Sequence, residues 1–175
     1  MQAHNVETIF RRLNESGVRY VVVDGLAVVA HGYARFTADV DLMLDLAEDN
    51  VLRALAVLKN EGFALRIPVP LELFADAATR ESWVRDKNML AYGLDSDRHP
   101  MTHVDIFASN PVDFEATFAQ AMRREIADGV EIVVISLDGL IYLKELAGRP
   151  QDKLDIEYLR RLQEAQRHDE PSSNE

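Results

Sequence analysis

The chain has 175 residues, a hydrophobic content of 47% and a formal net charge of −11. These values fit one globular domain with a full hydrophobic core and exclude a disordered composition. The sequence has no cysteine, which rules out disulfides, zinc–thiolate sites and cysteine nucleophiles. The acidic balance disfavours non-specific nucleic-acid binding, although it leaves room for a local basic groove. No apolar run approaches the roughly 20 residues that span a bilayer, so we expect no membrane partner and a cytoplasmic location.

The first half of the chain shows clear periodic patterns, interrupted by glycine at Gly17, Gly25, Gly32 and Gly62. Apolar residues three and four apart predict helices, and alternating or continuous β-formers predict strands. In chain order we expect a helix over 6–15, a buried strand over 20–23, a short helix over 26–31, a strand over 39–44 and a helix over 49–60.

The second half begins with residues 63–98, the hardest stretch to place, where we expect a strand over 88–92 and a turn over 95–100. After it we expect a strand over 102–107, a helix over 114–122, a hairpin of strands 124–126 and 131–135, and helices over 137–147 and 151–166. Strands and helices in this order indicate an α+β (mixed α/β) domain over residues 1–167. Residues 168–175 read as a polar C-terminal tail.

Paired aspartates on two predicted strands are the most informative feature. Asp39 and Asp41 stand at i and i+2, so both carboxylates project from one face of a strand. Two like charges on a half-buried strand repel each other, and a divalent cation removes that cost. Asp105 repeats the pattern on the 102–107 strand, and three carboxylates converge if the two strands are neighbours. Mg²⁺ prefers such a set of carboxylate oxygens with phosphates and water. Ordinary solvated surface carboxylates are the alternative.

A strand runs into a glycine turn and then a helix at Val23-Asp24-Gly25-Leu26. Helix N-termini present free amides and partial positive charge, which suits a phosphate. The alternative is an ordinary helix start with Asp24 as its N-cap.

Lys144 lies in the middle of the apolar stripe of the 137–147 helix, not on its polar face. An ammonium there must reach out to water or meet an anion. If it faces the aspartates, it binds a nucleotide phosphate or neutralises the carboxylates; a lysine at the rim of the core is the alternative.

The stretch from Tyr20 to Leu44 resembles the nucleotidyltransferase signature, in which a Gly-Gly or Gly-Ser turn precedes an Asp-x-Asp strand. It is most similar to bacterial nucleotidyltransferase-like proteins related to abortive-infection and toxin–antitoxin toxins. Residues in matching places are Gly25-Leu26-Ala27, His31-Gly32, Arg35, Thr37 and Asp39-Val40-Asp41. Residues 136–155, with Lys144, Gly148-Arg149-Pro150, Asp152 and Asp155, resemble the closing helices of that family.

This resemblance implies the polymerase-β-like nucleotidyltransferase fold, a central mixed sheet flanked by helices. It implies transfer of a nucleoside monophosphate from an NTP to a hydroxyl with Mg²⁺ or Mn²⁺. The acceptor would be an RNA end, a protein or a small molecule, and an antitoxin protein would be a further partner. The implied catalytic and metal-binding residues are Asp39, Asp41 and Asp105. The implied nucleotide-binding residues are Gly25, Leu26, Thr37 and Lys144.

The chain departs from the family pattern at one position, because Asp24 stands where the family has its first glycine. A carboxylate there places negative charge where a triphosphate would lie. Two functions therefore stay open, an active nucleotidyltransferase and a catalytically inactive member that binds a nucleotide, a metal or a protein partner.

Overall fold

The computed structural model describes residues 3–67 and 69–169. Within them, strands form at β1 (Tyr20–Val23), β2 (Asp39–Leu44), β3 (Phe63–Leu65), β4 (Ala91–Ser96), β5 (His103–Phe107), β6 (Met122–Ala127) and β7 (Val130–Val134). Helices form at α1 (Ala3–Glu15), α2 (Asp24–Ala30), α3 (Glu48–Asn60), α4 (Ala77–Lys87), α5 (Phe114–Gln120), α6 (Leu137–Ala147) and α7 (Pro150–Asp169), with a 3₁₀ helix η1 (Leu71–Ala75). None of the helices in this part of the chain combines the length and apolar character needed to cross a membrane.

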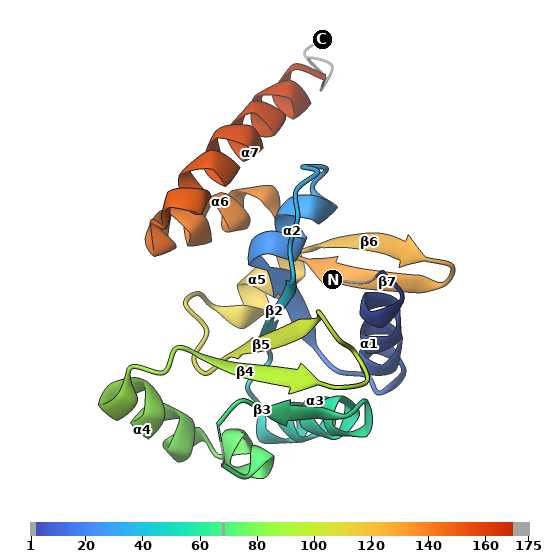
Figure 1. The fold of residues 1–175 in the computed structure, drawn as a ribbon. Coiled ribbons are helices and arrows are strands. Elements are labelled where there is room, and N and C mark those ends of the chain that lie inside the picture. Colours follow the sequence, from blue (N-terminus) through green and yellow to red (C-terminus); the bar gives the residue numbers. More distant parts are fainter. Residues whose placement is uncertain (1–2, 68, 170–175) are drawn as a thin grey trace.

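The seven strands form one sheet in the order β3-β4-β5-β2-β1-β7-β6, and the helices pack around it (Figure 1). β1 pairs with β7 and β2 pairs with β5 in parallel, whereas the other four neighbouring pairs are antiparallel. The mixed sheet with helices around it confirms the predicted mixed α/β class. β2, which carries two of the aspartates, lies near the middle of the sheet.

The two faces of the central strands differ in chemistry. Val40 and Leu42 of β2 are fully buried, whereas Asp39 and Asp41, which alternate with them, are half-buried. Tyr20, on the same face as Leu42 by strand pairing, packs on Phe10 of α1 with ring centroids 5.4 Å apart. Therefore α1 covers the apolar face, and the aspartates project from the opposite face.

The middle of the chain differs from its sequence-based prediction. The strand expected over 88–92 forms but is shifted to Ala91–Ser96, because Asn88 is the left-handed C-cap of α4. The turn expected over 95–100 starts later, since Asp95 still pairs with β3. β3, η1 and α4 were not predicted. Trp83 is buried against Tyr92, at a centroid distance of 4.8 Å, as packing rather than as an exposed stacking surface.

The C-terminal third follows the prediction closely. The hairpin of β6 and β7 forms, but α5 ends at Gln120, because Met122 already pairs with Val134 in the sheet. α6 and α7 pack against each other, and α6 also contacts α2 (Figure 1). α7 extends to Asp169, so the predicted polar tail begins inside this helix, and residues 170–175 lie outside the described residues.

Candidate active site

Strand register brings the three predicted metal ligands together. Asp105 of β5 is the direct partner of Asp41 on the parallel neighbour β2, and Asp39 is the partner of His103. Adjacent strands lie ~4.8 Å apart, and directly paired residues project from the same face. Asp105 is thus next to Asp41, and all three carboxylates share one face of the sheet.

The charges of this group shift the acidity of two members. The pKa of Asp41 is raised to about 8, first by burial and then by the negative charges of Asp24, Asp105 and Asp39. Burial also raises the pKa of Asp105, although the guanidinium of Arg66 opposes the rise. Like charges held together in a partly dehydrated site favour a bound cation. Carboxylate oxygens are the donors that Mg²⁺ and Mn²⁺ prefer, so this set of residues fits such an ion.

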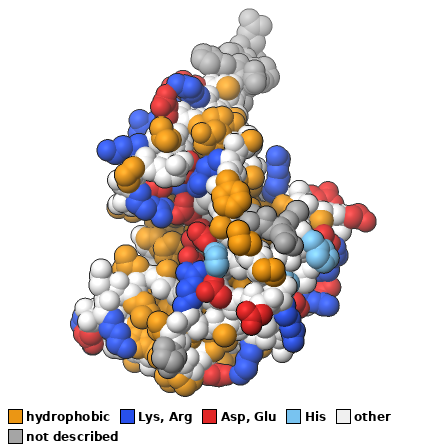
Figure 2. Space-filling view, in the orientation of Figure 1, with side chains coloured by type: hydrophobic (Ala, Val, Ile, Leu, Met, Phe, Trp, Pro, Cys, Tyr) orange, Lys and Arg blue, Asp and Glu red, His pale blue; other side chains and the backbone are white. Residues whose placement is uncertain are grey.

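The aspartates line a cavity of about 410 Å³. Its walls come from the start of α2, the loop before β2 and the junction of α6 with α7. Figure 2 shows acidic and basic side chains gathered in the hollow near the middle of this face. The lining residues are Asp24, Gly25, Arg35, Phe36, Thr37, Ala38, Asp39, Asp41, Asp105, Arg149, Gln151 and Asp152. Five aspartates against two arginines make the cavity acidic, so a phosphate-bearing ligand would enter it with cations.

The four predicted nucleotide-binding residues occupy different positions. Gly25 and Thr37 line the cavity. Leu26 lies in the hydrophobic core, 6% exposed, and it is not part of the cavity lining. Lys144 is 2% exposed and does not line the cavity either. Gly25 and Thr37 thus line the same cavity as the aspartates, whereas Lys144 is buried behind the cavity wall.

Gly25 is required by close packing. A Cβ atom at this position would lie 2.6 Å from Thr37 Oγ1 and 3.0 Å from Arg35 Nη2. We expect Gly25→Ala to lower the free energy of unfolding by about 1–3 kcal/mol, the usual cost of overpacking. Urea denaturation measures the loss. Adding Thr37→Ala removes the nearest atom and should restore part of the stability; equal stability of wild type and Gly25→Ala would contradict this packing.

Lys144 meets anions on three sides. Its Nζ lies 2.8 Å from Asp24 Oδ1, 3.0 Å from Asp152 Oδ1 and 2.8 Å from Asp155 Oδ2. Burial tends to lower the pKa of Lys144, but hydrogen bonds to the three carboxylates outweigh it and raise the pKa. Of the two outcomes expected for an ammonium in the apolar stripe, the structure has the one in which it is neutralised by anions.

Arg149 extends the same network. It forms ion pairs with Asp24 and with Asp152, the latter with Nε 2.8 Å from Oδ2. Burial tends to raise the pKa of Asp24, yet hydrogen bonds from Lys144 and Arg149 hold it below its ordinary value. The N-cap position of α2 is held by Val23, and Asp24 is the first residue of the helix. Asp24 is thus not an N-cap, and its negative charge is balanced by two cations.

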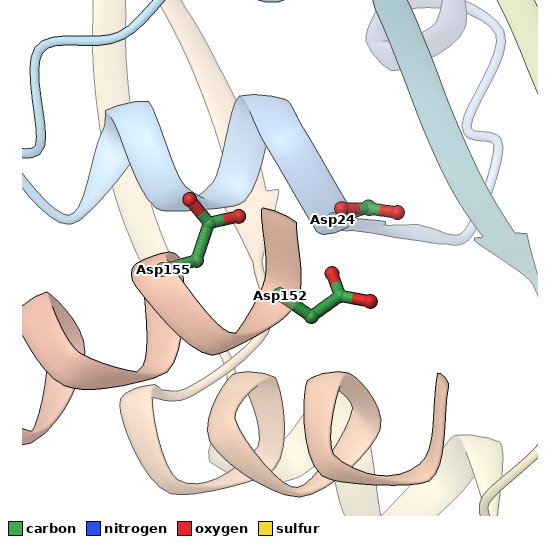
Figure 3. Close-up of side chains that lie close together, drawn as sticks. All are labelled: Asp24, Asp152 and Asp155. Atoms are coloured by element: carbon green, nitrogen blue, oxygen red, sulfur yellow. The ribbon is translucent and has the colours of Figure 1, made fainter. Parts of the chain in front are cut away.

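The cluster of Asp24, Asp152 and Asp155 has the geometry of a metal site, since its ligand oxygens lie within 4.8 Å of one another. Figure 3 shows the three side chains lying close together, Asp24 on α2 and Asp152 and Asp155 on α7. The ammonium of Lys144 already contacts all three at 2.8–3.0 Å. Lys144 therefore supplies the positive charge that a metal ion would bring, and we assign no ion to this cluster.

No protein-family model matches the sequence, and no curated protein sequence matches it. Solved structures do match. The lincosamide antibiotic adenylyltransferase LnuA, bound to lincomycin, is 14% identical with a TM-score of 0.62, over 93% of this chain and 98% of that chain. The antibiotic-resistance factor ANT(2'')-Ia is 13% identical with a TM-score of 0.58, over 95% of this chain and 91% of that chain. TM1012 from Thermotoga maritima is 16% identical with a TM-score of 0.53, over 93% and 92%.

The chain has the polymerase-β-like nucleotidyltransferase fold. The likeness covers 93–95% of this chain and 91–98% of these neighbours. At identities of 13–16% it establishes the fold. The predicted fold is confirmed, and a particular closeness to toxin–antitoxin proteins is not among these findings.

Arg66, directly after β3, lies beside the aspartates and was not predicted. Its Nη1 is 3.7 Å from Asp105 Oδ1, and its Nε donates to Asp95 Oδ2 at 3.0 Å. Gly93 makes room for it, because a Cβ there would lie 2.8 Å from Arg66 Nη1. His103 Nδ1 contacts the same Asp95 at 2.5 Å. These contacts hold a guanidinium against Asp105 on the side away from α2.

Arg149 and Asp152 line the cavity, although the sequence analysis did not predict them as site residues. The helix dipole sufficed to explain Asp152 in the first turn of a helix. The available signal was that two unusual charges, Asp24 in a glycine position and Lys144 in an apolar stripe, each lacked a partner. The structure pairs them across 120 residues of sequence.

Proposed function

We propose that this protein is a nucleotidyltransferase that moves a nucleoside monophosphate from an NTP to a hydroxyl group. The observation that carries the proposal is the register pairing of Asp41 with Asp105, beside Asp39, at the floor of an acidic cavity. Asp39, Asp41 and Asp105 would hold Mg²⁺ or Mn²⁺. When bound, this ion supplies positive charge that offsets the phosphates and the carboxylates.

The side chains then divide the work. Asp105, next to Asp41, accepts the proton of the attacking hydroxyl. The hydroxyl oxygen forms a bond to the α-phosphorus, the bond from that phosphorus to the β-phosphate oxygen breaks, and pyrophosphate leaves. Arg66 keeps a positive charge 3.7 Å from Asp105, which favours the ionised carboxylate.

The nucleotide phosphates would lie along Gly25 and Thr37, with the exposed guanidinium of Arg149 at the cavity wall. Lys144 acts through Asp24 and Asp152, whose carboxylates it orients, and we treat it as a positioning residue. The charge balance at Asp24 supports this arrangement, because the carboxylate is neutralised by Lys144 and Arg149 instead of facing the phosphates alone.

A small-molecule hydroxyl is the acceptor class that the structural neighbours favour. LnuA is described as a lincosamide adenylyltransferase, and ANT(2'')-Ia was crystallised with adenylyl-2''-tobramycin. An RNA end or a protein hydroxyl would fit the toxin-like signature of residues 20–44, in which case an antitoxin would be the partner. The assay must therefore include small molecules, RNA and proteins as acceptors.

Transfer of label from α-³²P-NTPs tests the proposal. Wild type is offered each NTP, Mg²⁺ or Mn²⁺, and in turn small antibiotics, RNA and protein acceptors. We expect a labelled acceptor with wild type and a loss of about 10³-fold or more with Asp41→Asn or Asp105→Asn, because a charge at the reacting centre is removed. Asp49→Asn, on the exposed start of α3, is the control and should retain activity.

A catalytically inactive binding protein is the second candidate, favoured by Asp24 in the glycine turn. Its cavity would hold a nucleotide without turnover. Calorimetric binding of NTP with Mg²⁺, together with no transfer to any acceptor class, would select it over the enzyme. Absence of both binding and transfer would contradict both candidates.

A further inference from the structure

A second, apolar cavity of about 220 Å³ lies next to the acidic one. Asp24 and Arg149 line both, so their ion pair forms part of a shared wall. The remaining lining is hydrophobic: Val23, Phe107, Pro111, Leu143, Leu146 and Ala147. A charged compartment and an apolar compartment thus meet at one pair of side chains.

The floor of this apolar cavity continues the floor of the metal site. Phe107 follows Asp105 by two residues on β5, so both side chains project from the same face. Val23 of β1 is the register partner of Asp41. A ligand bound at the aspartates would therefore have the ring of Phe107 and the side chain of Val23 beside the part that reacts.

Leu143, Leu146 and Ala147 from the last turns of α6 form the opposite wall of this cavity, and part of that wall is exposed to solvent. Leu146 is 59% exposed although it belongs to the cavity wall. Apolar surface left open beside a charged site is typical of a ligand-binding cleft with a few polar groups. The matching ligand would have a flat uncharged part joined to an anionic part.

The size of the cavity narrows the choice. Sites for whole drug-sized ligands measure roughly 300–1,000 Å³, so about 220 Å³ holds one ring system rather than an entire antibiotic. A nucleobase is planar and uncharged, and it stacks well on aromatic rings and guanidinium planes. Phe107 and Arg149 offer these two surfaces, and the Asp24 carboxylate at the rim can accept a hydrogen bond from an exocyclic amino group.

We propose that the apolar cavity binds the nucleobase of the donor NTP while its phosphates lie in the acidic cavity. The inference rests on the proposed function insofar as an NTP is the donor. It assigns Phe107, Leu143, Leu146 and Ala147 as the base-binding residues and the Asp24–Arg149 pair as the boundary between base and phosphates.

A matched pair of variants tests it. Leu146→Asn makes the cavity wall polar without adding charge, and Leu146 is exposed enough for the fold to tolerate the change. Leu154→Asn is the control, since Leu154 of α7 is 56% exposed and lines neither cavity. Thermal unfolding checks that both variants fold. Calorimetry with Mg²⁺ then gives the Kd of ATP and of inorganic tripolyphosphate, which lacks base and sugar.

We expect wild type to bind ATP more tightly than tripolyphosphate. In Leu146→Asn, the Kd of ATP should rise roughly 5- to 20-fold, the effect of losing part of one apolar contact, and that of tripolyphosphate should not change. Leu154→Asn should behave as wild type. Equal wild-type affinities for the two ligands, or an unchanged Kd of ATP in Leu146→Asn, would overturn the base site.

The same variants separate this inference from the proposed function. If Leu146→Asn raises the KM for the acceptor and leaves the Kd of ATP unchanged, the cavity binds the acceptor. That result would overturn the base site and would not contradict the proposed transfer reaction. Binding of ATP that depends on Leu146, without any transfer, would support the base site and contradict the enzyme. Binding of neither ATP nor tripolyphosphate by wild type would contradict both.

Discussion

Lys144→Met is expected to lower the free energy of unfolding by about 3–5 kcal/mol at pH 7. The ammonium is 2% exposed and contacts three carboxylates, two of which belong to Asp152 and Asp155, at 1% and 0% exposure. Methionine fills similar volume but leaves these carboxylates buried without their common partner, and removing one member of a buried ion pair typically costs this much. Urea denaturation followed by circular dichroism gives the value.

Controls identify the cause of that loss. Lys153→Met changes an exposed lysine of the same region and should cost under about 1 kcal/mol, as for most surface substitutions. Adding Asp155→Asn to Lys144→Met removes one of the stranded charges and should recover stability. Despite burial, Lys144 helps to hold the pKa values of Asp24 and Asp152 below the ordinary 3.8, so the deficit should also shrink as the pH falls below about 4 and wild type loses this contribution. Equal losses for Lys144→Met and Lys153→Met would show that the buried network contributes little.

Asp41→Asn is expected to abolish transfer and yet make the metal-free protein more stable at alkaline pH. The folded state holds the Asp41 pKa at about 8, against an ordinary value of 3.8. Because the folded state binds the proton more tightly than the unfolded state, wild-type stability falls as the pH rises from about 4 to about 8. Asparagine does not titrate, so the stability of the variant should not decrease over this pH range for this reason.

The magnitude follows from the shift. At ~1.36 kcal/mol per pKa unit the full effect has an upper bound of about 6 kcal/mol, and solvent in the open cavity reduces it, so we expect about 2–4 kcal/mol. Unfolding of wild type and Asp41→Asn from pH 5 to 9 in EDTA measures the difference, which should grow with pH. Asp49→Asn should run parallel to wild type over this range, because its pKa is lowered by Arg53 and it is already ionised.

Magnesium should reverse the order at alkaline pH. Binding of Mg²⁺ to the ionised group stabilises wild type by mass action, while the variant lacks one ligand. Parallel pH curves of wild type and Asp41→Asn in EDTA would mean that Asp41 is not destabilised in the folded protein, and the electrostatic description of the site would then be wrong.

The elements that the sequence predicted are those whose signal is local. Residues 39–44 alternate between charge and apolar side chain, so the strand and the common face of Asp39 and Asp41 follow directly. Helices such as 49–60 carry a complete apolar stripe and a closing glycine. Over 63–98 the strands are short, and α4 has almost no amphipathic pattern, so local periodicity gave no sufficient signal there.

The contacts that complete the site depend on long-range pairing, so the sequence predicted Asp105 and Lys144 as site residues without fixing their partners, and it did not predict Arg66 at all. Strand order decides whether Asp105 lies beside Asp41, so the sequence could predict this contact only on the condition that the two strands are neighbours. The contact of Lys144 with Asp24 joins residues 120 positions apart. Arg66 reaches Asp105 only because Gly93 lacks a side chain, and that relation exists only once β3, β4 and β5 are assembled.

The attachment of α7 has a practical consequence for anyone who shortens or splits this polypeptide. Asp152 and Asp155 from this helix neutralise Lys144, Arg35 pairs with Asp155, and Tyr158 stacks on Tyr33. Cutting the chain before Pro150 would leave Lys144 with Asp24 alone of its three carboxylate partners and would expose the surface on which α7 packs. Shortened or fused forms of the protein should therefore retain α7 through Asp169 and carry any tag or label after it.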